Sequence, residues 1–368
     1  MYCSGYAVKV PGKLMIAGEY AVLEPYQKAV VTAIDRYVTA TIKPSKINSL
    51  CLPQLGLENI TWRIKEGKVE FSKYDKRLSF IENSILTAIQ FLEENSIRLS
   101  PFQLELSSEL YDALSGQKYG LGSSAAVVTA VTSAIIKLHS GKESLNFLKV
   151  FKLSSIAHVR TQKSGSGADI AAAVYGGWLE YSTFDSKWLL EELKEEKSIS
   201  SLIEKPWPYL FIKDIIPPKV LKLAVGWTRQ SVATVLMIKS FENYKKSNIE
   251  SYNEFLKESS AAVGSLIQSF ELRDCTGAIV ALSENRKILQ KLGEKAGVNI
   301  ENHMLKRLCS IAENYGSGKP SGAGGGDCGI AFVNDDFKLI ELNKAWKASD
   351  IVPLDIIVSK DGISIESL

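Results

Sequence analysis

Alternating hydrophobic and polar positions indicate strands over much of the first third of the chain. Pro11-Gly12 should interrupt the first of them and leave Lys13 between two strands, where local evidence favours an exposed hairpin lysine. Glu66-Gly67 predicts a hairpin turn. Period-two alternation or short apolar runs predict strands at Tyr6 to Val10, Leu14 to Ala17, Ala29 to Ile34, Tyr37 to Ile42, Ile60 to Ile64, Lys68 to Phe71 and Phe102 to Leu106.

Apolar residues spaced three and four apart indicate helices along most of the remaining chain. Ser79 to Asn95 has this pattern, and Ser79 with Glu82 has the spacing of a capping box. Ala125 to Leu138 is an apolar run that predicts a buried helix. Further helices are predicted at Asn146 to Val159, Ile170 to Val174, Val232 to Tyr244, Ile249 to Phe270, Asp274 to Lys291, His303 to Tyr315 and Asp336 to Ala348, and further strands at Gly177 to Tyr181, Val220 to Trp227, Cys328 to Val333 and Ile351 to Val358.

Chain length and two proline clusters indicate two domains. A chain of 368 residues exceeds the usual size of one hydrophobic core. Lys187 to Lys205 is rich in charge, and we interpret it as a solvated helix and linker. Pro206-Trp207-Pro208 and Pro217-Pro218 follow this segment. We therefore place the domains at residues 1–205 and 206–368.

Composition and charge are those of a soluble globular protein. Hydrophobic residues make up 45% of the chain and charged residues 23%. The 44 basic and 41 acidic residues leave a net charge of +3, which argues against a nucleic acid or an anionic membrane as partner. No apolar run approaches the length of a membrane span.

The cysteine pattern favours a reducing compartment. Cys3, Cys51, Cys275, Cys309 and Cys328 are widely spaced, and no Cys-x-x-Cys pair occurs. Their odd number and the lack of a signal peptide favour reduced thiols and a cytoplasmic location. The three histidines lie far apart in the sequence, so a structural zinc site is not expected.

The segment from Lys118 to Ala126 places two glycines before the predicted buried helix. Gly120 and Gly122 permit backbone conformations closed to other residues, and Ser123 and Ser124 offer hydroxyl groups for capping the helix. A glycine turn that opens a helix presents unpaired N–H groups and a partial positive charge, which together suit a phosphate. An ordinary capped turn is the alternative. The segment is not a Walker A loop, because no Gly-Lys-Ser/Thr closes it.

Two further glycine-rich stretches each end in an aspartate. Ser164 to Asp169 leads into a short helix, so Asp169 is either an acid favoured by the helix dipole or a carboxylate near a reacting hydroxyl. Gly316 to Asp327 opens directly into the predicted strand at Cys328 to Val333. Because a flexible linker is not usually joined to a strand in this way, we interpret this stretch as a loop held against a ligand.

Three motifs spread over nearly the whole chain carry a family resemblance. They are Pro11-Gly12-Lys13-Leu14 with Gly18-Glu19-Tyr20-Ala21, then Gly120-Leu121-Gly122-Ser123-Ser124-Ala125, and then Ser321-Gly322-Ala323-Gly324-Gly325-Gly326-Asp327. In order and wording they resemble the motifs of the GHMP kinases, named after galactokinase, homoserine kinase, mevalonate kinase and phosphomevalonate kinase. The wording is most similar to the phosphomevalonate kinase branch, since mevalonate kinases typically carry His at the position of Tyr20 and Gly at that of Asp327.

The resemblance implies an α+β fold of two domains. The first would be a β-α domain and the second a ferredoxin-like domain, with the active site in the cleft between them. ATP and a magnesium ion are implied as cofactors, with the metal at Ser124. The residues implied to bind the nucleotide are Gly120, Leu121, Gly122, Ser123, Ser124 and Ala125 from the second motif and Gly322, Ala323 and Gly324 from the third.

The resemblance also implies a reaction, the transfer of the γ-phosphate of ATP to 5-phosphomevalonate. Lys13 and Asp169 match the catalytic pair of the family, and the site would stabilise charge and align the reactants. A phosphate monoester is largely ionised at neutral pH, so Asp169 would position the acceptor more than deprotonate it. The residues named for the acceptor are Glu19, Tyr20, Lys118, Arg160, Ser166 and Gly167.

One position departs from the mevalonate kinase pattern. Where those enzymes carry a metal-binding glutamate, this chain has His158, and magnesium prefers oxygen ligands. Metal binding would then depend on Ser124 and the nucleotide. Arg160, Lys163 and Lys118 could bind the acceptor phosphate, although for each of them alone the sequence favours a solvated basic residue.

Three other functions compete with this interpretation. They are a mevalonate kinase, a diphosphomevalonate decarboxylase, and a non-catalytic relative that binds a sugar or nucleotide. The presence of both Lys13 and Asp169 argues against the last of these. The partner expected is therefore a small molecule, and the oligomeric state expected is a monomer or homodimer.

Overall fold

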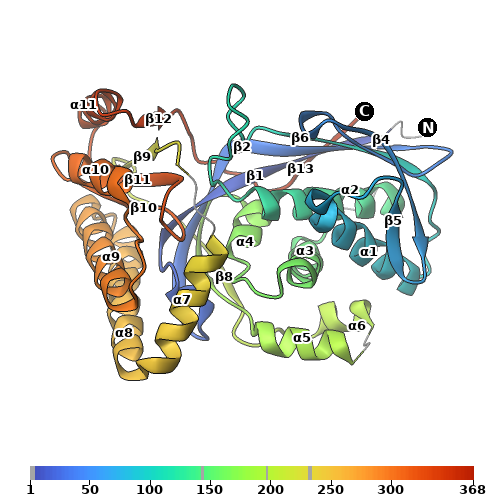
Figure 1. Ribbon diagram of the computed structural model, residues 1–368, viewed down its shortest axis with the longest axis horizontal. Coiled ribbons are helices and arrows are strands. Elements are labelled where there is room, and N and C mark those ends of the chain that lie inside the picture. Colours follow the sequence, from blue (N-terminus) through green and yellow to red (C-terminus); the bar gives the residue numbers. More distant parts are fainter. Residues whose placement is uncertain (1–4, 142–144, 196–197, 231–233) are drawn as a thin grey trace.

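The computed structural model describes residues 5–141, 145–195, 198–230 and 234–368. Two halves lie side by side (Figure 1), and the first is built on one large sheet. Its strands run in the order β13-β1-β2-β6-β3-β4-β5, with β7 also pairing with β2 and β8 with β7. The strands are β1 (Tyr6–Ala17), β2 (Lys28–Pro44), β3 (Ser49–Leu52), β4 (Leu57–Lys65), β5 (Lys68–Phe71), β6 (Phe102–Ser108), β7 (Trp178–Ser182), β8 (Phe211–Ile215) and β13 (Ser364–Ser367).

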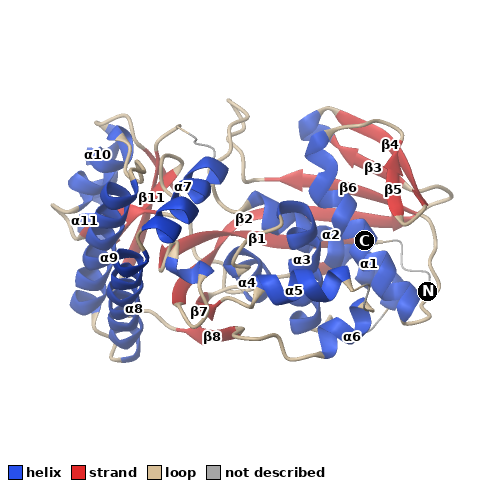
Figure 2. Cartoon of the chain, turned by 60° about the horizontal axis from the view of Figure 1, so that its bottom comes forward, coloured by secondary structure: helices blue, strands red, loops and turns tan. Residues whose placement is uncertain are grey.

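Helices cover one face of this sheet (Figure 2). α2 and α4 contact β1 and β2 directly, and α1 and α3 pack on α2. The apolar run predicted as a buried helix is α2, in which most side chains from Ala125 to Ile136 are buried. The helices of this half are α1 (Ser79–Glu94), α2 (Ser123–Ser140), α3 (Phe147–Gln162), α4 (Ala168–Tyr175), α5 (Ser186–Lys194) and α6 (Ile199–Glu204), with short 3-10 helices η1 (Ala21–Leu23), η2 (Pro53–Leu55) and η3 (Lys76–Leu78).

The second half contains a smaller antiparallel sheet, in the order β10-β11-β9-β12. α10 and α11 pack on this sheet, and α8 and α9 pack on each other. The elements are β9 (Lys222–Trp227), α7 (Thr234–Ser247), α8 (Ile249–Glu271), α9 (Cys275–Ala296), α10 (His303–Ala312), β10 (Ser317–Pro320), β11 (Cys328–Val333), α11 (Asp336–Lys347) and β12 (Val352–Leu354). The predicted α+β fold is confirmed.

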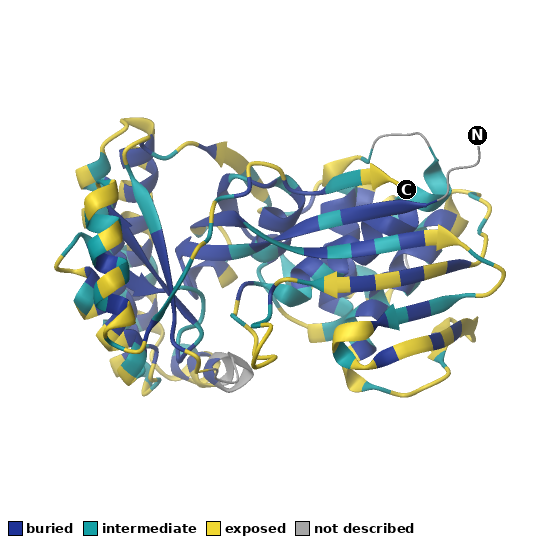
Figure 3. Cartoon of the chain, turned by 90° about the horizontal axis from the view of Figure 1, so that it is seen from above, coloured by how far each residue is buried: buried dark blue, intermediate teal, exposed yellow. Residues whose placement is uncertain are grey.

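Burial follows the hydrophobic pattern that predicted the strands. In β6, Phe102, Leu104 and Leu106 are buried while the residues between them are exposed. Figure 3 shows this alternation on the outer strands, and it shows that the long central strands are buried along most of their length. The helices on one face exclude water from alternate positions, which is why period two identified these strands.

Four of the predicted strands join into two. The strands predicted before and after Pro11-Gly12 are one strand, β1, and the next two predicted strands are both part of β2. β1 passes through Pro11-Gly12, where Pro11 pairs with Tyr37 and Gly12 with Ile34, so the predicted break is a shift of register within one continuous strand. A Cβ atom at Gly12 would lie 2.6 Å from Leu110 Cδ2 and 2.7 Å from the Leu121 carbonyl oxygen, so glycine permits close packing there. Lys13 consequently lies within β1 and is half-buried, which corrects its placement between strands and excludes the exposed hairpin lysine.

Helix capping differs from the prediction at two places. The predicted capping box of Ser79 and Glu82 does not form. The short helix η3 leads directly into α1, and the N-cap residue is Leu78, which has no side chain that could cap the helix. Ser123 and Ser124 do not cap α2 either. Gly122 holds the N-cap position with a φ of 80°, and both serines lie in the first turn. The Glu66-Gly67 hairpin is confirmed between β4 and β5.

The remaining differences concern the ends of the chain and the domain boundary. The stretch from Gly316 to Asp327 is not wholly a loop, because its first part forms β10. The strands β3, β8 and β13 were not predicted. Cys3 and the predicted helix start at Val232 lie outside the described residues. The boundary at residue 205 stays a prediction, and β8 and β13, which follow it in sequence, hydrogen bond within the large sheet. No helix in the described ranges is long and apolar enough to cross a membrane.

Candidate active site

The glycine loop between β6 and α2 contacts the first motif of the chain, the part of β1 that carries Lys13. The Lys13 amide donates to the Leu121 carbonyl at 2.9 Å. A Cβ atom at Gly122 would lie only 2.8 Å from Lys13 Cγ, so the lysine stem occupies the space beside this glycine. Gly120 is exposed, Ser123 and Ser124 are half-buried, and Ala125 is buried at the start of α2. The helix N-terminus and the Lys13 ammonium therefore add their positive charge at one place.

The third glycine stretch closes on the same motif from the second half. Ser321 Oγ accepts from the Met15 amide at 3.1 Å and donates to the Met15 carbonyl at 2.9 Å. The Tyr20 hydroxyl donates to the Ala323 carbonyl. A Cβ atom at Gly322 would lie 3.9 Å from Lys13 Nζ. The first, second and third motifs thus meet around Lys13.

A buried ion pair joins the first motif to β10. The Lys319 ammonium pairs with Glu19 and also donates to the Pro320 carbonyl, and the two charged side chains are 0% and 2% exposed. The Gly322 amide also donates to Glu19 Oε1 at 3.4 Å. Glu19 was named for the acceptor, and that role stays a prediction. In the structure Glu19 contacts Lys319. Nothing in the sequence indicated this pair, because the two residues are 300 positions apart.

Asp169 lies in the first turn of α4, as expected. Gly167 is the N-cap with a φ of 76°, and the Ser166 carbonyl accepts hydrogen bonds from the hydroxyls of Tyr181 and Thr183. Burial, together with the negative charge of Asp169, raises the pKa of Tyr181. Since α4 packs on β1, the helix that carries Asp169 rests on the strand that carries Lys13.

The segment before β13 fixes the C-terminal end of α4. The Ile363 amide donates to the Val174 carbonyl at 3.3 Å, and the Gly177 amide donates to the Ser359 carbonyl at 2.8 Å. The backbone around Gly176 approaches that of residues 360–362 so closely that a side chain at Gly176 would collide with it. The position of Asp169 is therefore set from both ends of its helix.

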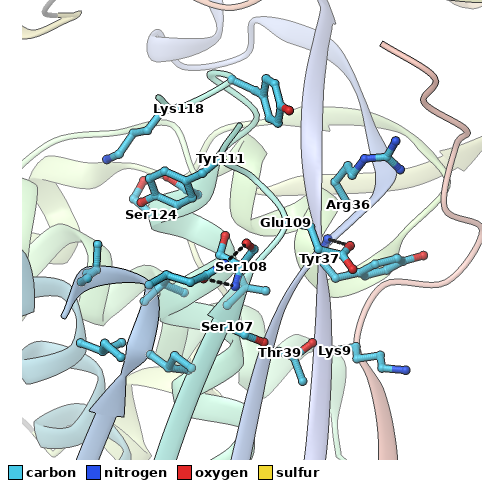
Figure 4. A pocket seen from close by; sticks show the side chains of 18 of the residues that line it. Lys9, Arg36, Tyr37, Thr39, Ser107, Ser108, Glu109, Tyr111, Lys118 and Ser124 are labelled. Carbon is cyan, nitrogen blue, oxygen red and sulfur yellow. Dashed lines mark hydrogen bonds between the residues drawn. The ribbon is translucent and has the colours of Figure 1, made fainter. Parts of the chain in front are cut away.

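A cavity of about 1470 Å³ lies beside the glycine loop. Its lining includes Lys118, Ser123 and Ser124, three of the residues named for nucleotide or acceptor. Figure 4 shows Ser124 and Lys118 on one side of it and Arg36 and Tyr37 on the other. The Tyr37 amide donates to the Glu109 carboxylate at 3.0 Å across its floor. The cavity has the mixed polar and apolar lining of a small-molecule site, and it is larger than most such sites.

The basic residues named for the acceptor phosphate are placed differently from one another. The Arg160 guanidinium donates to Thr87 Oγ1 and Gln90 Oε1 on α1, and burial lowers its pKa. Lys163 is exposed at the C-terminal end of α3. Lys118 is exposed on the hairpin that leads into the glycine loop, with its ammonium 5.8 Å from the Tyr111 ring centre.

The described residues hold no group of three or more His, Cys, Asp or Glu side chains that could bind a metal ion. His158, at the position of the expected glutamate, is 5% exposed and packs 5.3 Å from the Phe80 ring. An oxygen donor is available at the Ser124 hydroxyl on the cavity wall. These residues suit a magnesium ion held mainly by a nucleotide.

Family models match both halves of the chain. The model for the N-terminal domain of the GHMP kinases matches residues 83–177, and the model for their C-terminal domain matches residues 275–350. One relative is 30% identical along nearly the whole chain. With the fold and the three convergent motifs, these findings show that the chain belongs to the GHMP kinases, a family of phosphotransferases.

Individual relatives show which members of the family this chain is similar to. The phosphomevalonate kinase of Streptomyces sp. (strain CL190) is the 30% identical relative, over 96% of this chain and 97% of its own. The crystal structure of a Lin0012 protein from Listeria innocua has a TM-score of 0.91 at 38% identity, covering 98% and 99% of the two chains. Streptococcus pneumoniae phosphomevalonate kinase in complex with phosphomevalonate and AMPPNP has a TM-score of 0.82 at 28% identity, covering 96% and 99%. Mevalonate kinases also match, at lower identity than the Streptomyces enzyme.

Proposed function

We propose that this kinase phosphorylates 5-phosphomevalonate with ATP, giving 5-diphosphomevalonate and ADP. The observation that carries the proposal is the meeting of the three family motifs around Lys13, beside a cavity lined by the loop serines. Both the Streptomyces relative and the pneumococcal structure are phosphomevalonate kinases, which supports the choice of acceptor.

The nucleotide would bind with its phosphates at the loop. The backbone N–H groups of residues 120–125 and the Lys13 ammonium would offset phosphate charge without reorganising during the reaction. Gly322, Ala323 and Gly324 would cover the phosphates from the second half. Magnesium, when bound, supplies further charge neutralisation at the transferring phosphate, and Ser124 would hold it from the protein side.

Lys13 and Asp169 would act on the acceptor side. Lys13 would stabilise charge on the transferred phosphoryl group, and Asp169 would orient the attacking phosphate oxygen of the acceptor. Since that oxygen is already largely ionised at neutral pH, orientation matters more than proton removal. Glu19, Tyr20, Lys118, Arg160, Ser166 and Gly167 remain the residues proposed for the acceptor.

An acceptor assay tests the proposal. Purified enzyme is given MgATP with 5-phosphomevalonate or with mevalonate, and ADP formation is followed for each. We expect kcat/KM for phosphomevalonate to exceed that for mevalonate by at least about a hundredfold, because a site that pairs a phosphate with cations discriminates strongly against its absence. A preference for mevalonate would overturn the proposal, and release of carbon dioxide would indicate a decarboxylase instead.

The non-catalytic alternative is tested by Asp169→Asn. We expect this variant to bind ADP as the wild type does and to lose turnover. If neither variant nor wild type turns over any acceptor while both bind nucleotide, the chain is a binding protein.

A further inference from the structure

Asp327, the last residue of the third glycine stretch, has an unusual backbone conformation that is firmly held. Its φ is 57°, which non-glycine residues seldom adopt. Its amide donates to the Gln230 carbonyl at 2.5 Å, and its carbonyl accepts from the amide and the hydroxyl of Thr228, both at 2.9 Å. The end of β9 thus fixes Asp327 in a stretch where glycine would avoid the strain. Strain of this kind at a site is a reason to look for a role of the side chain.

The Asp327 side chain lies directly against the first glycine of the phosphate loop. A Cβ atom at Gly120 would be 2.5 Å from Asp327 Cβ and 2.6 Å from its Cγ and Oδ2. The adjacent residues are also joined, because Cys328 Sγ donates to the Tyr119 carbonyl at 3.1 Å. Gly120 must therefore be glycine to admit Asp327, whatever ligand the loop binds.

Two lysines lie near enough to this carboxyl group to influence its pKa, without forming an ion pair with it. Burial raises the pKa of Asp327, and the charges of Lys13 and Lys118 oppose that rise. Asp327 Oδ1 is buried and has no hydrogen-bond partner among the described residues. A buried carboxylate oxygen without a partner at an anion site costs stability, so a functional reason for its presence is expected.

We propose that Asp327 is a positioning residue of the nucleotide site, whose carboxylate orients the ammonium groups of Lys13 and Lys118 and offsets part of their charge. The inference rests on the proposed function in one respect, namely that the loop at Gly120 receives the phosphates. A carboxylate at this place weakens the binding of product phosphates in the ground state. It also keeps the lysines directed at the position where charge develops during transfer. Binding and turnover should consequently respond to its removal in opposite directions.

The test is Asp327→Asn, studied by calorimetric titration with ADP and with pyrophosphate and by steady-state kinetics. Asn tolerates positive φ and keeps the side-chain volume, so the fold should be retained. We expect ADP to bind three- to tenfold more tightly, with a steeper dependence on salt, because the lysines are no longer neutralised. We expect kcat to fall at least about tenfold. Asp327→Gly removes the same charge without strain and should behave alike.

The control is Asp336→Asn, an exposed aspartate at the start of α11 in the same half of the molecule. It removes one negative charge without changing the phosphate loop, and ADP affinity should stay at the wild-type value. If Asp327→Asn binds ADP more weakly than the wild type, or equally, Asp327 only packs against the loop and the inference is wrong. If the wild type itself binds no ADP, the proposed function fails instead.

Discussion

Lys13 connects three segments that are far apart in the sequence. Its amide bonds to Leu121, its stem lies beside Gly122, and its ammonium approaches Gly322. The register of β1 against β2 shifts at Pro11-Gly12, just before this lysine. A side chain held by its own strand and two loops is preorganised, which is the property that electrostatic catalysis needs.

Lys13→Met should therefore abolish most turnover. We expect kcat to fall by at least about a hundredfold, the usual effect of removing one preorganised donor to a developing charge. Methionine retains the packing of the stem beside Gly122, so the melting temperature should change little. Lys43→Met, at an exposed lysine near the end of β2, is the matched control and should keep wild-type kcat. Equal kcat in the two variants would remove Lys13 from the mechanism.

Asp327 makes stability depend on pH in a defined direction. Because burial raises the pKa of its carboxyl group, the folded protein favours the protonated form, and ionisation on going from acid to neutral pH costs stability. The Asp327→Asn variant has no carboxyl group to ionise at this place, so its stability is not lowered in this way. Chemical denaturation should show the variant more stable than the wild type at pH 7, with the difference shrinking as pH falls towards the ordinary aspartate pKa of about 4. A difference that is constant over this range would contradict a buried, ionised carboxylate.

At the scale of elements, the glycine loop and α2 form one unit. The helix begins at a left-handed glycine and not at a serine cap, which leaves the hydroxyls of Ser123 and Ser124 free to face the cavity. Sequence propensity favours serine at an N-cap, but the left-handed turn at Gly122 moves both serines one position into the helix. The local preference is overridden by the approach of β1 and its lysine.

A pair of glycine variants separates backbone strain from this contact. Gly122→Ala and Gly297→Ala both place alanine at a left-handed position, which costs about 1 kcal/mol. At Gly297 the new methyl group meets nothing within 4 Å, whereas at Gly122 it would lie 2.8 Å from Lys13 Cγ. We expect both variants to fold but only Gly122→Ala to lose kcat, about tenfold or more, because it displaces the lysine. Equal kcat values in the two variants would show that the contact between Gly122 and Lys13 is not needed for turnover.

At the scale of the whole molecule, specific polar and aromatic contacts hold the two halves together around the site. Ser321 forms hydrogen bonds with the backbone of Met15, and the Tyr20 hydroxyl donates to the Ala323 carbonyl. The ring centres of Tyr20 and Phe241, which lies on α7, are 4.1 Å apart. The ion pair of Glu19 and Lys319 lies at the centre of these contacts and is almost fully buried. Removing one partner leaves an uncompensated charge, whereas removing both removes the cost of burying them.

A double-mutant cycle measures this ion pair. Glu19→Leu and Lys319→Met should each destabilise the fold by about 3–5 kcal/mol, and the double variant should recover most of that loss. Urea unfolding gives the three values, and ADP titration of the double variant shows whether nucleotide binding at the glycine loop is retained. Additive losses in the double variant would mean that the two residues stabilise the fold independently.

Features with a local signal were predictable from the sequence. Helices such as α1 and α8 repeat their apolar residues every three or four positions, and strands such as β6 alternate, so each reveals the face it buries. The glycine stretches and the helix position of Asp169 were visible because Gly and helix N-termini have strong local preferences. Lys13 and Gly122 were named for the same site by resemblance, and the fold brings them into contact.

Only the tertiary structure decided how these segments meet. The continuity of β1 through Pro11-Gly12 depends on its pairing with β2, and β13 exists because it pairs with β1 more than 350 positions away. The pairing of Glu19 with Lys319 and the packing of Asp327 against Gly120 leave no pattern in either local sequence. A periodic pattern records which side of an element faces away from water, but it does not record which other element lies there.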